Sequence, residues 1–223
     1  MKVNINFGLF SAVFPILLYL VLSFIFGLTG FESYSLLPYL LKQSIFLSIV
    51  YFYYKKFFNF DLFKEFNINL KNFLETMKSR RTVFLLIFCA GIVRIVIGHF
   101  YDLNDIMPYT LNIEFFTFML LGGIFIAPFI EEIIFRGILL SYFVNKTNLH
   151  IQISSLIVGT IFGLMHYQYY GNLLLLGAVI FLGYLLCVIV NKYDNLVYAI
   201  LIHFVNNLLG TILLLIVYLG KGV

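Results

Sequence analysis

Charged residues are scarce in this chain: of its 223 residues only 11% are Asp, Glu, Lys or Arg, whereas 62% are hydrophobic. Soluble domains average roughly 45–50% apolar and about 25% charged residues. A water-soluble globule of this size could not hide so much apolar surface, so the composition excludes a soluble enzyme, a nucleic-acid-binding protein and a disordered chain. The mean hydropathy of +1.03 instead predicts a polytopic membrane protein.

Cysteine is rare, and the motifs of several hydrolase classes are missing. The two cysteines, Cys89 and Cys187, lie singly in apolar runs, so neither a disulfide framework nor a zinc ribbon is indicated. The chain contains no His-Glu-x-x-His zinc motif and no Gly-x-Ser-x-Gly nucleophile elbow. A buried aspartyl pair is not expected either, because all four aspartates fall in predicted loops (residues 61, 102, 105 and 194).

Seven apolar runs approach the roughly 20 residues that a membrane-spanning helix needs. They lie near 7–28, 36–54, 82–101, 113–138, 153–170, 173–190 and 196–219. No internal repeat and no Gly-, Pro- or Ser-rich linker divides them. We therefore expect an all-α fold, a transmembrane helical bundle of about seven spans that forms a single membrane domain over residues 1–223.

Positive charge is concentrated in residues 55–81, which hold seven basic and three acidic residues, a net charge of +4 that equals that of the whole protein. Basic loops stay in the cytoplasm, so this loop and, with seven spans, the N-terminus are expected inside. The stretch from Phe57 to Met77 interleaves apolar and basic positions, which suits an anionic inner leaflet. Membrane lipids, and no nucleic acid, are the partners expected for these charges.

The most unusual polar residues lie in the fourth predicted span, where Glu131 and Glu132 are adjacent and Arg136 follows. Charges at bilayer depth are costly, so each needs a partner or a purpose. Neighbours on a helix point about 100° apart, so the two acids face different sides. Glu132 and Arg136 have the spacing of an intrahelical ion pair, which leaves Glu131 as a candidate general base. The alternative is a helix-packing patch of ion pairs.

Two later spans carry a histidine with a possible partner one helical turn away. Phe162 and His166 share a face of the fifth predicted span, and His203 and Asn207 share a face of the seventh. A Gly-x-x-x-Gly spacing over 159–163 would let another helix approach closely. Either histidine alone is a candidate core residue, but their combination with the buried acids predicts a polar site.

Helical rise provides a test of this combination, because the side chains must lie at similar depth. A rise of about 1.5 Å per residue places Glu131 and His203 at similar distances from the inner ends of their spans. His166 comes out deeper, which predicts that the fifth span begins late, near Ser154 or Ser155.

The three motifs resemble those of one family. Glu-Glu-x-x-x-Arg at 131–136, Phe-x-x-x-His at 162–166 and His-x-x-x-Asn at 203–207 occur in this order on separate spans. This resembles the CPBP family, which comprises type II CAAX prenyl endopeptidases and bacterial relatives in bacteriocin processing and self-immunity, also called the Abi family. The similar region runs from about 115 to 210, and residues 1–110 carry no identifiable part of it.

The resemblance implies an intramembrane endopeptidase with a catalytic core over residues 111–215. Residues 1–110 then supply N-terminal spans and the basic loop. By resemblance, Glu131 activates a water with help from His166, while His203 and Asn207 orient the scissile carbonyl and stabilise the oxyanion. Supporting roles fall to Glu132, Arg136 and Phe162.

The residues leave two questions open, whether a metal takes part and what the substrate is. Glu131, His166 and His203 are a plausible zinc ligand set, but an unaided glutamate base with two histidines is equally compatible, and we favour no cofactor. The substrate is a membrane-associated peptide, such as a bacteriocin or pheromone precursor, or a lipidated protein C-terminus.

Other functions compete with the hydrolase. A non-catalytic membrane immunity or scaffold protein of the same fold has little reason to keep four polar groups in hydrocarbon. A solute or proton carrier would need a through-going polar path, and the outer halves of the last three spans look too apolar. The bias towards Phe, Tyr, Ile, Asn and Lys suggests an AT-rich bacterial genome, so we expect a multi-pass protein of the bacterial plasma membrane.

Overall fold

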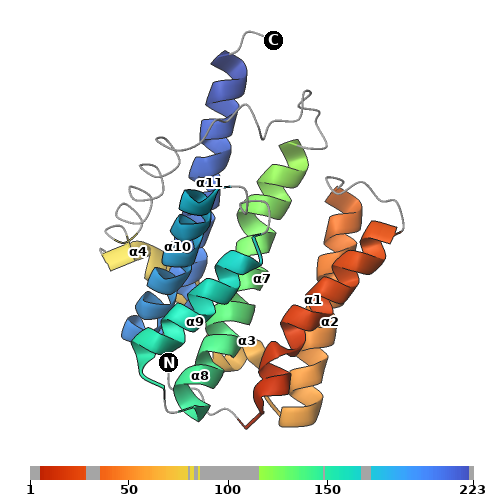
Figure 1. The fold of residues 1–223 in the computed structure, drawn as a ribbon, viewed down its shortest axis with the longest axis vertical. Helices are drawn as coiled ribbons and strands as arrows, with labels where there is room; N and C mark the ends of the chain where they lie inside the picture. The colour runs from red at the N-terminus through yellow and green to blue at the C-terminus, as the bar shows by residue number, and fades with distance from the viewer. Residues whose placement is uncertain are drawn as a thin grey trace.

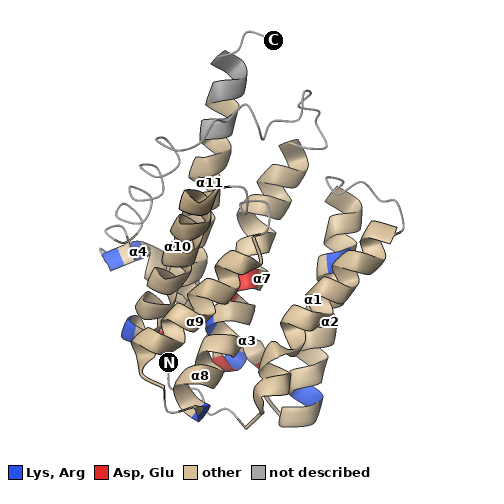
Figure 2. Cartoon of the chain, viewed as in Figure 1, with Lys and Arg blue, Asp and Glu red and all other residues tan. Residues whose placement is uncertain are grey.

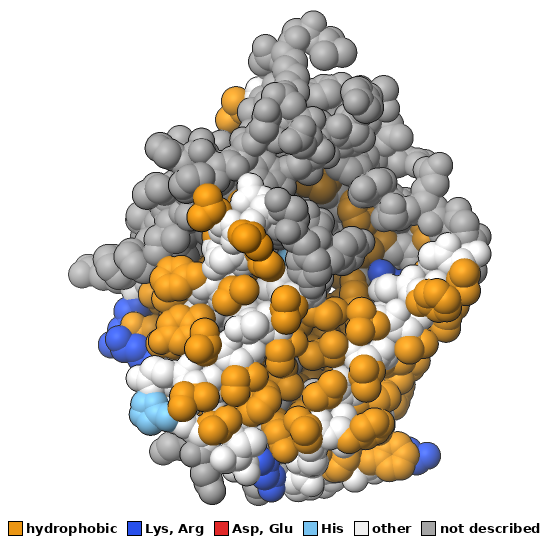
Figure 3. All heavy atoms as spheres, viewed as in Figure 1, with side chains coloured by type: hydrophobic (Ala, Val, Ile, Leu, Met, Phe, Trp, Pro, Cys, Tyr) orange, Lys and Arg blue, Asp and Glu red, His pale blue; other side chains and the backbone are white. Residues whose placement is uncertain are grey.

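The computed structural model describes residues 6–28, 36–79, 81–82, 85, 116–147, 149–166 and 172–220. Every regular element in this part of the chain is a helix, which confirms the predicted all-α class (Figure 1). The long helices lie side by side as a bundle, and hydrophobic side chains cover much of its flank (Figure 3). Such an apolar flank is suited to contact with lipid.

The N-terminal part of the bundle is an antiparallel pair, α1 (Leu9–Leu28) and α2 (Leu36–Phe58). Two short helices follow, α3 (Leu62–Glu65) and α4 (Leu70–Lys78). The side chains of Asp61 and Asn69 accept hydrogen bonds from backbone amides in the first turns of α3 and α4, the usual way to begin a helix.

The fourth predicted span is one continuous helix, Phe118–Lys146, which extends beyond the predicted end at residue 138. It consists of four segments, η2 (Phe118–Ile126), α7 (Ala127–Glu132), η3 (Ile133–Leu139) and α8 (Leu140–Lys146). The two η segments are π-helical, a conformation that is rare and frequently found at functional sites. The acidic pair therefore lies at the end of a short α-helical segment between two π-helical ones.

Three helices complete the bundle: α9 (Ile151–Leu164), α10 (Leu173–Tyr193) and α11 (Leu196–Gly220). The close approach predicted from the glycine spacing is present, and the partner of α9 is α10. A Cβ atom at Gly159 would lie 2.6 Å from the backbone nitrogen of Tyr184, and one at Gly183 would lie 2.9 Å from the Cα of Gly159. Only glycine at these positions lets the two backbones meet.

The described residues contain four helices long and apolar enough to cross a membrane, namely α1, α2, Phe118–Lys146 and α10. Shorter apolar helices cover 151–164 and 196–212. The span predicted near 82–101 falls almost wholly outside the described residues, so the count of seven stays a prediction.

Lysines mark one end of the bundle. Lys55 and Lys56 end α2, Lys146 ends α8 and Lys192 lies in the last turn of α10, all near the end where α1 begins (Figure 2). Positive charge favours the cytoplasmic side of a membrane. This distribution supports the predicted orientation.

Candidate active site

The central feature of the site is a carboxylate that faces two imidazoles. Oε2 of Glu131 lies 4.0 Å from Nε2 of His166 and 3.9 Å from Nε2 of His203. This oxygen is buried and has no hydrogen-bond partner in the described part of the chain. A separation near 4 Å is too long for a direct hydrogen bond. The structure thus brings together three predicted site residues from α7, α11 and the turn after α9.

His166 reaches the site from just outside its helix. The prediction of a late start for this span is wrong, since α9 begins at Ile151; it also ends at Leu164, before the predicted end at residue 170. The His166 amide donates to the carbonyl of Gly163 at 2.9 Å, while its imidazole Nδ1 lies 2.7 Å from the carbonyl of Phe162. That carbonyl would accept the backbone N–H of His166 in a continuing α-helix. The imidazole therefore replaces the backbone donor where the helix ends.

The same contact determines the protonation of the imidazole. A carbonyl oxygen only accepts hydrogen bonds, so Nδ1 of His166 must carry a proton. In the neutral ring, Nε2 is then the acceptor, and this is the atom that faces Glu131.

Glu132 occupies a different environment from its neighbour, as predicted from the helix geometry. Its Oε1 accepts hydrogen bonds from Nη1 of Arg136 and from Nδ1 of His203, both at 2.8 Å. Glu132 and Arg136 are fully buried. Nη2 of Arg136 also donates to the carbonyl of Gly183 on α10 at 3.2 Å. The intrahelical ion pair predicted from the sequence is present, but the bond from Glu132 to His203 was not foreseen.

Phe162 packs between these groups. Its ring centroid lies 4.5 Å from that of His166 and 5.7 Å from that of His203. The Cζ of Arg136 lies 4.3 Å from the same centroid, the distance of a cation–π contact. One buried aromatic ring therefore contacts both imidazoles and covers the guanidinium.

Asn207 is anchored to the helix that carries the acids. Its Nδ2 donates to the carbonyl of Gly123 at 2.8 Å. The amide of Ala127 bonds to the carbonyl of Gly122, five residues back. The next donor in this register would be Pro128, which has no N–H, so Asn207 supplies the missing donor. Its amide has a second N–H, which this contact does not use.

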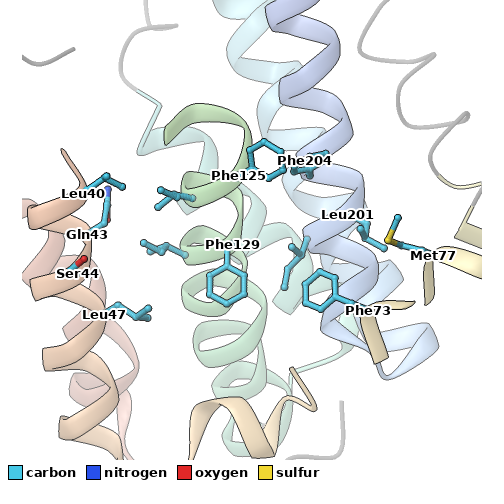
Figure 4. A pocket seen from close by; sticks show the side chains of 13 residues that line it. Leu40, Gln43, Ser44, Leu47, Phe73, Met77, Phe125, Phe129, Leu201 and Phe204 are labelled. Carbon is cyan, nitrogen blue, oxygen red and sulfur yellow. The ribbon is translucent and has the colours of Figure 1, made fainter. Parts of the chain in front are cut away.

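An apolar cavity of about 610 Å³ adjoins the site helices (Figure 4). Phe129 and Ile130 of α7 line it just before Glu131 in the chain, while Ile200 and Phe204 of α11 flank His203 in sequence. Residues of α2 and α4 form the other walls, namely Leu40, Gln43, Ser44, Leu47, Phe73 and Met77. The cavity can accommodate an apolar group beside the polar site.

The candidate metal ligands, Glu131, His166 and His203, lie too far apart to bind one zinc ion together. No group of three or more His, Cys, Asp or Glu side chains among the described residues is arranged to hold a metal. Tetrahedral zinc with bonds of about 2 Å needs ligand atoms about 3.3 Å apart. The gaps from Glu131 to the two imidazoles are wider, at 3.9 and 4.0 Å.

Comparison with known proteins bears on the part of the chain that holds these residues. Residues 113–209 match the family model described as type II CAAX prenyl endopeptidase Rce1-like. No curated protein and no solved structure matches the chain. The matched region contains all three motifs and begins after α1, α2 and α4. Residues 113–209 of this membrane protein therefore carry a domain similar to the Rce1-like type II CAAX prenyl endopeptidases, the family that the motifs predicted.

Proposed function

We propose that the protein is an intramembrane endopeptidase in which Glu131 and His166 activate a water molecule for attack on a peptide bond. The observation that carries the proposal is the buried, unbonded Oε2 of Glu131, which faces the Nε2 atoms of His166 and His203. A water placed between these atoms can donate to the carboxylate and to the neutral imidazole of His166. General bases of this kind contribute about 10²–10⁴ in rate.

The proposed reaction conserves atoms and protons. Glu131, assisted by His166, takes one proton from the water, and the water oxygen bonds to the scissile carbonyl carbon. The carbonyl π electrons move to oxygen and form the oxyanion. When the oxyanion collapses, the C–N bond breaks and the leaving nitrogen takes the proton from Glu131. The products are a carboxylic acid and an amine.

His203 and Asn207 are the proposed oxyanion donors. Because Glu132 accepts from Nδ1 of His203, donation to substrate requires a second proton on Nε2. With that proton, the charges of Glu131, Glu132, Arg136 and His203 sum to zero, which favours the arrangement in a buried site. Asn207 would contribute the N–H that Gly123 does not use.

Supporting roles fall to Glu132, Arg136 and Phe162, which act through other residues. Glu132 orients His203, and Arg136 neutralises Glu132. Phe162 packs against both imidazoles and limits their rotation.

The substrate proposed is a membrane-associated peptide or a lipidated protein C-terminus, with an apolar portion in the cavity beside α7 and α11. The location proposed is the bacterial plasma membrane, with the lysine-rich end of the bundle in the cytoplasm. Bacteriocin or pheromone precursors are suitable substrates in that setting.

The test compares membrane peptides by mass spectrometry in cells with the wild-type protein, Glu131→Gln or His166→Ala, followed by cleavage of the peptides found by reconstituted protein. We expect both variants to lose cleavage while remaining folded in detergent. Glu65→Gln, the same change at an exposed position on α3, should cleave normally. Full activity in both site variants would reject the mechanism, and a cellular phenotype retained without cleavage would indicate an immunity or scaffold protein.

The metal question has its own test. Pure protein is analysed for bound metal, treated with a chelator and assayed again. Because the candidate ligands are too far apart for zinc, we expect cleavage to survive metal removal. Loss of cleavage that added zinc restores would show a metal site that forms by closure of these side chains.

A further inference from the structure

The short helix α4 has its polarity reversed relative to a helix that faces water. Its two buried side chains are polar, with Asn72 9% and Thr76 4% exposed. Its apolar residues Leu70, Leu74 and Met77 are 75%, 47% and 57% exposed. The spacing of these three residues aligns them along one side of the helix. A cytosolic surface helix would bury this row and expose the amide and the hydroxyl.

This orientation is fixed by hydrogen bonds. Asn72 and Asn195 exchange side-chain hydrogen bonds of 3.2 and 3.0 Å, and Asn195 also donates to Thr76 at 3.1 Å. Oδ1 of Asn195 accepts from the backbone amide of Val197 at the start of α11. The polar face of α4 therefore packs against the start of α11, and Leu70 and Leu74 face outwards.

Lysines neighbour the apolar row on α4 itself. Lys71 follows Leu70 and Lys78 follows Met77 in the chain. Residues 55–81 have a net charge of +4, the charge of the whole chain. Figure 2 shows basic positions on α4 in blue. A row of apolar side chains with neighbouring lysines is complementary to a membrane surface, where acyl chains lie beneath negatively charged headgroups.

We propose that α4 lies in the membrane interface on anionic lipid, with Leu70 and Leu74 among the upper acyl chains and Lys71 and Lys78 against lipid phosphates. A soluble partner protein would require the leucine row to be accessible from the cytosol. The apolar helix α11, to whose start α4 is hydrogen-bonded, instead places the bilayer next to this row, and the positive charge attracts its anionic headgroups. Lipid is therefore the occupant that both charge and location favour.

The chain contains no tryptophan, so one introduced tryptophan reports on a single position. Leu74→Trp is placed in the apolar row, and Glu75→Trp, the matched control, replaces a side chain that is 66% exposed beside it. Each variant is reconstituted in vesicles of phosphatidylglycerol and phosphatidylcholine, with brominated acyl chains on either one lipid or the other. Bromine quenches indole fluorescence only on close contact.

We expect brominated phosphatidylglycerol to quench the Leu74→Trp variant about twofold more than brominated phosphatidylcholine, as enrichment of anionic lipid near lysines requires. Glu75→Trp should be quenched less by both lipids. Replacing Lys71 and Lys78 with Gln should remove the difference between the lipids. Absence of quenching at position 74, repeated with Leu70→Trp, would overturn the proposal and favour a protein partner, and equal quenching by both lipids would overturn its anionic part.

Discussion

The two sides of α7 differ in how far their polar groups are satisfied. On one side, Glu132 is fully buried and its Oε1 accepts hydrogen bonds from both Arg136 and His203, although its Oε2 and Nε of Arg136 have no partner among the described residues. On the other side, the side chain of Glu131 is 28% exposed, and its Oε2 faces two imidazole nitrogens without bonding to either. A buried carboxylate held by two donors is fixed in position, whereas a carboxylate without such bonds can accept a proton. Adjacent residues of one type thus acquire different tasks from the helices that they face.

Removing the ion pair of Glu132 with Arg136 should have the largest effect on stability. Arg136→Leu would leave Glu132 buried without its cation, which we expect to lower the free energy of unfolding by about 3–5 kcal/mol. Denaturant titration in detergent measures this loss. Arg136→Lys keeps the charge and should lose less. If both variants unfolded like the wild type, the ion pair would not stabilise the bundle.

The packing of α9 on α10 holds the Gly183 carbonyl that Arg136 uses. Gly159→Leu would force a side chain against the backbone of α10, where even a Cβ comes within 2.6 Å of an atom. Overpacking of this kind costs about 1–3 kcal/mol, visible as a lower unfolding temperature. Gly177→Leu is the control, because nothing lies within 4 Å of a Cβ there, and it should unfold near the wild-type temperature.

The ring of Phe162 contacts both imidazoles, and its removal should affect the cleavage rate more than the stability of the fold. Phe162→Leu keeps an apolar side chain but removes the planar contact with both imidazoles. Misplaced catalytic groups react more slowly, and we expect the cleavage rate to fall by about tenfold, the loss of about 1.4 kcal/mol in the barrier. Steady-state kinetics should place the change in kcat; an unchanged kcat would show that the ring does not orient the histidines.

Pro128 should have the smallest effect, through Asn207. Pro128→Ala restores an N–H that can bond to the Gly123 carbonyl and so competes with the Asn207 side chain. We expect about a fivefold slower reaction, the equivalent of about 1 kcal/mol for one hydrogen bond. In an Asn207→Ala background the same substitution should have little further effect. Additive losses in the double variant would contradict the link between the two residues.

Sequence patterns predicted the elements of the site better than its orientation. Composition gave the helical membrane class, and spacing gave the ion pair of Glu132 with Arg136 and the separate direction of Glu131. The bond from Glu132 to His203 could not be predicted, because it depends on how α7 and α11 are rotated against each other. Two π-helical segments change that rotation, and only Pro128 in the sequence hints at them.

The end of α9 shows a second limit of the sequence. Residues 153–170 were predicted to form one span, and Gly163, next to the last helical residue, was assigned with Gly159 to helix packing rather than to a helix end. The helix ends where the His166 imidazole hydrogen-bonds to the Phe162 carbonyl. Hydrophobicity alone does not predict such a side-chain contact. This early end, rather than the late start that we predicted, accompanies the approach of His166 to Glu131.

The most direct measurement is the paired comparison of Glu131→Gln with Glu132→Gln, for cleavage rate and unfolding temperature in one preparation. We predict that Glu131→Gln loses cleavage by at least about a hundredfold with an unchanged or higher unfolding temperature, while Glu132→Gln lowers that temperature. Glu131→Gln protein that cleaves at the wild-type rate would show that the reaction does not use this carboxylate.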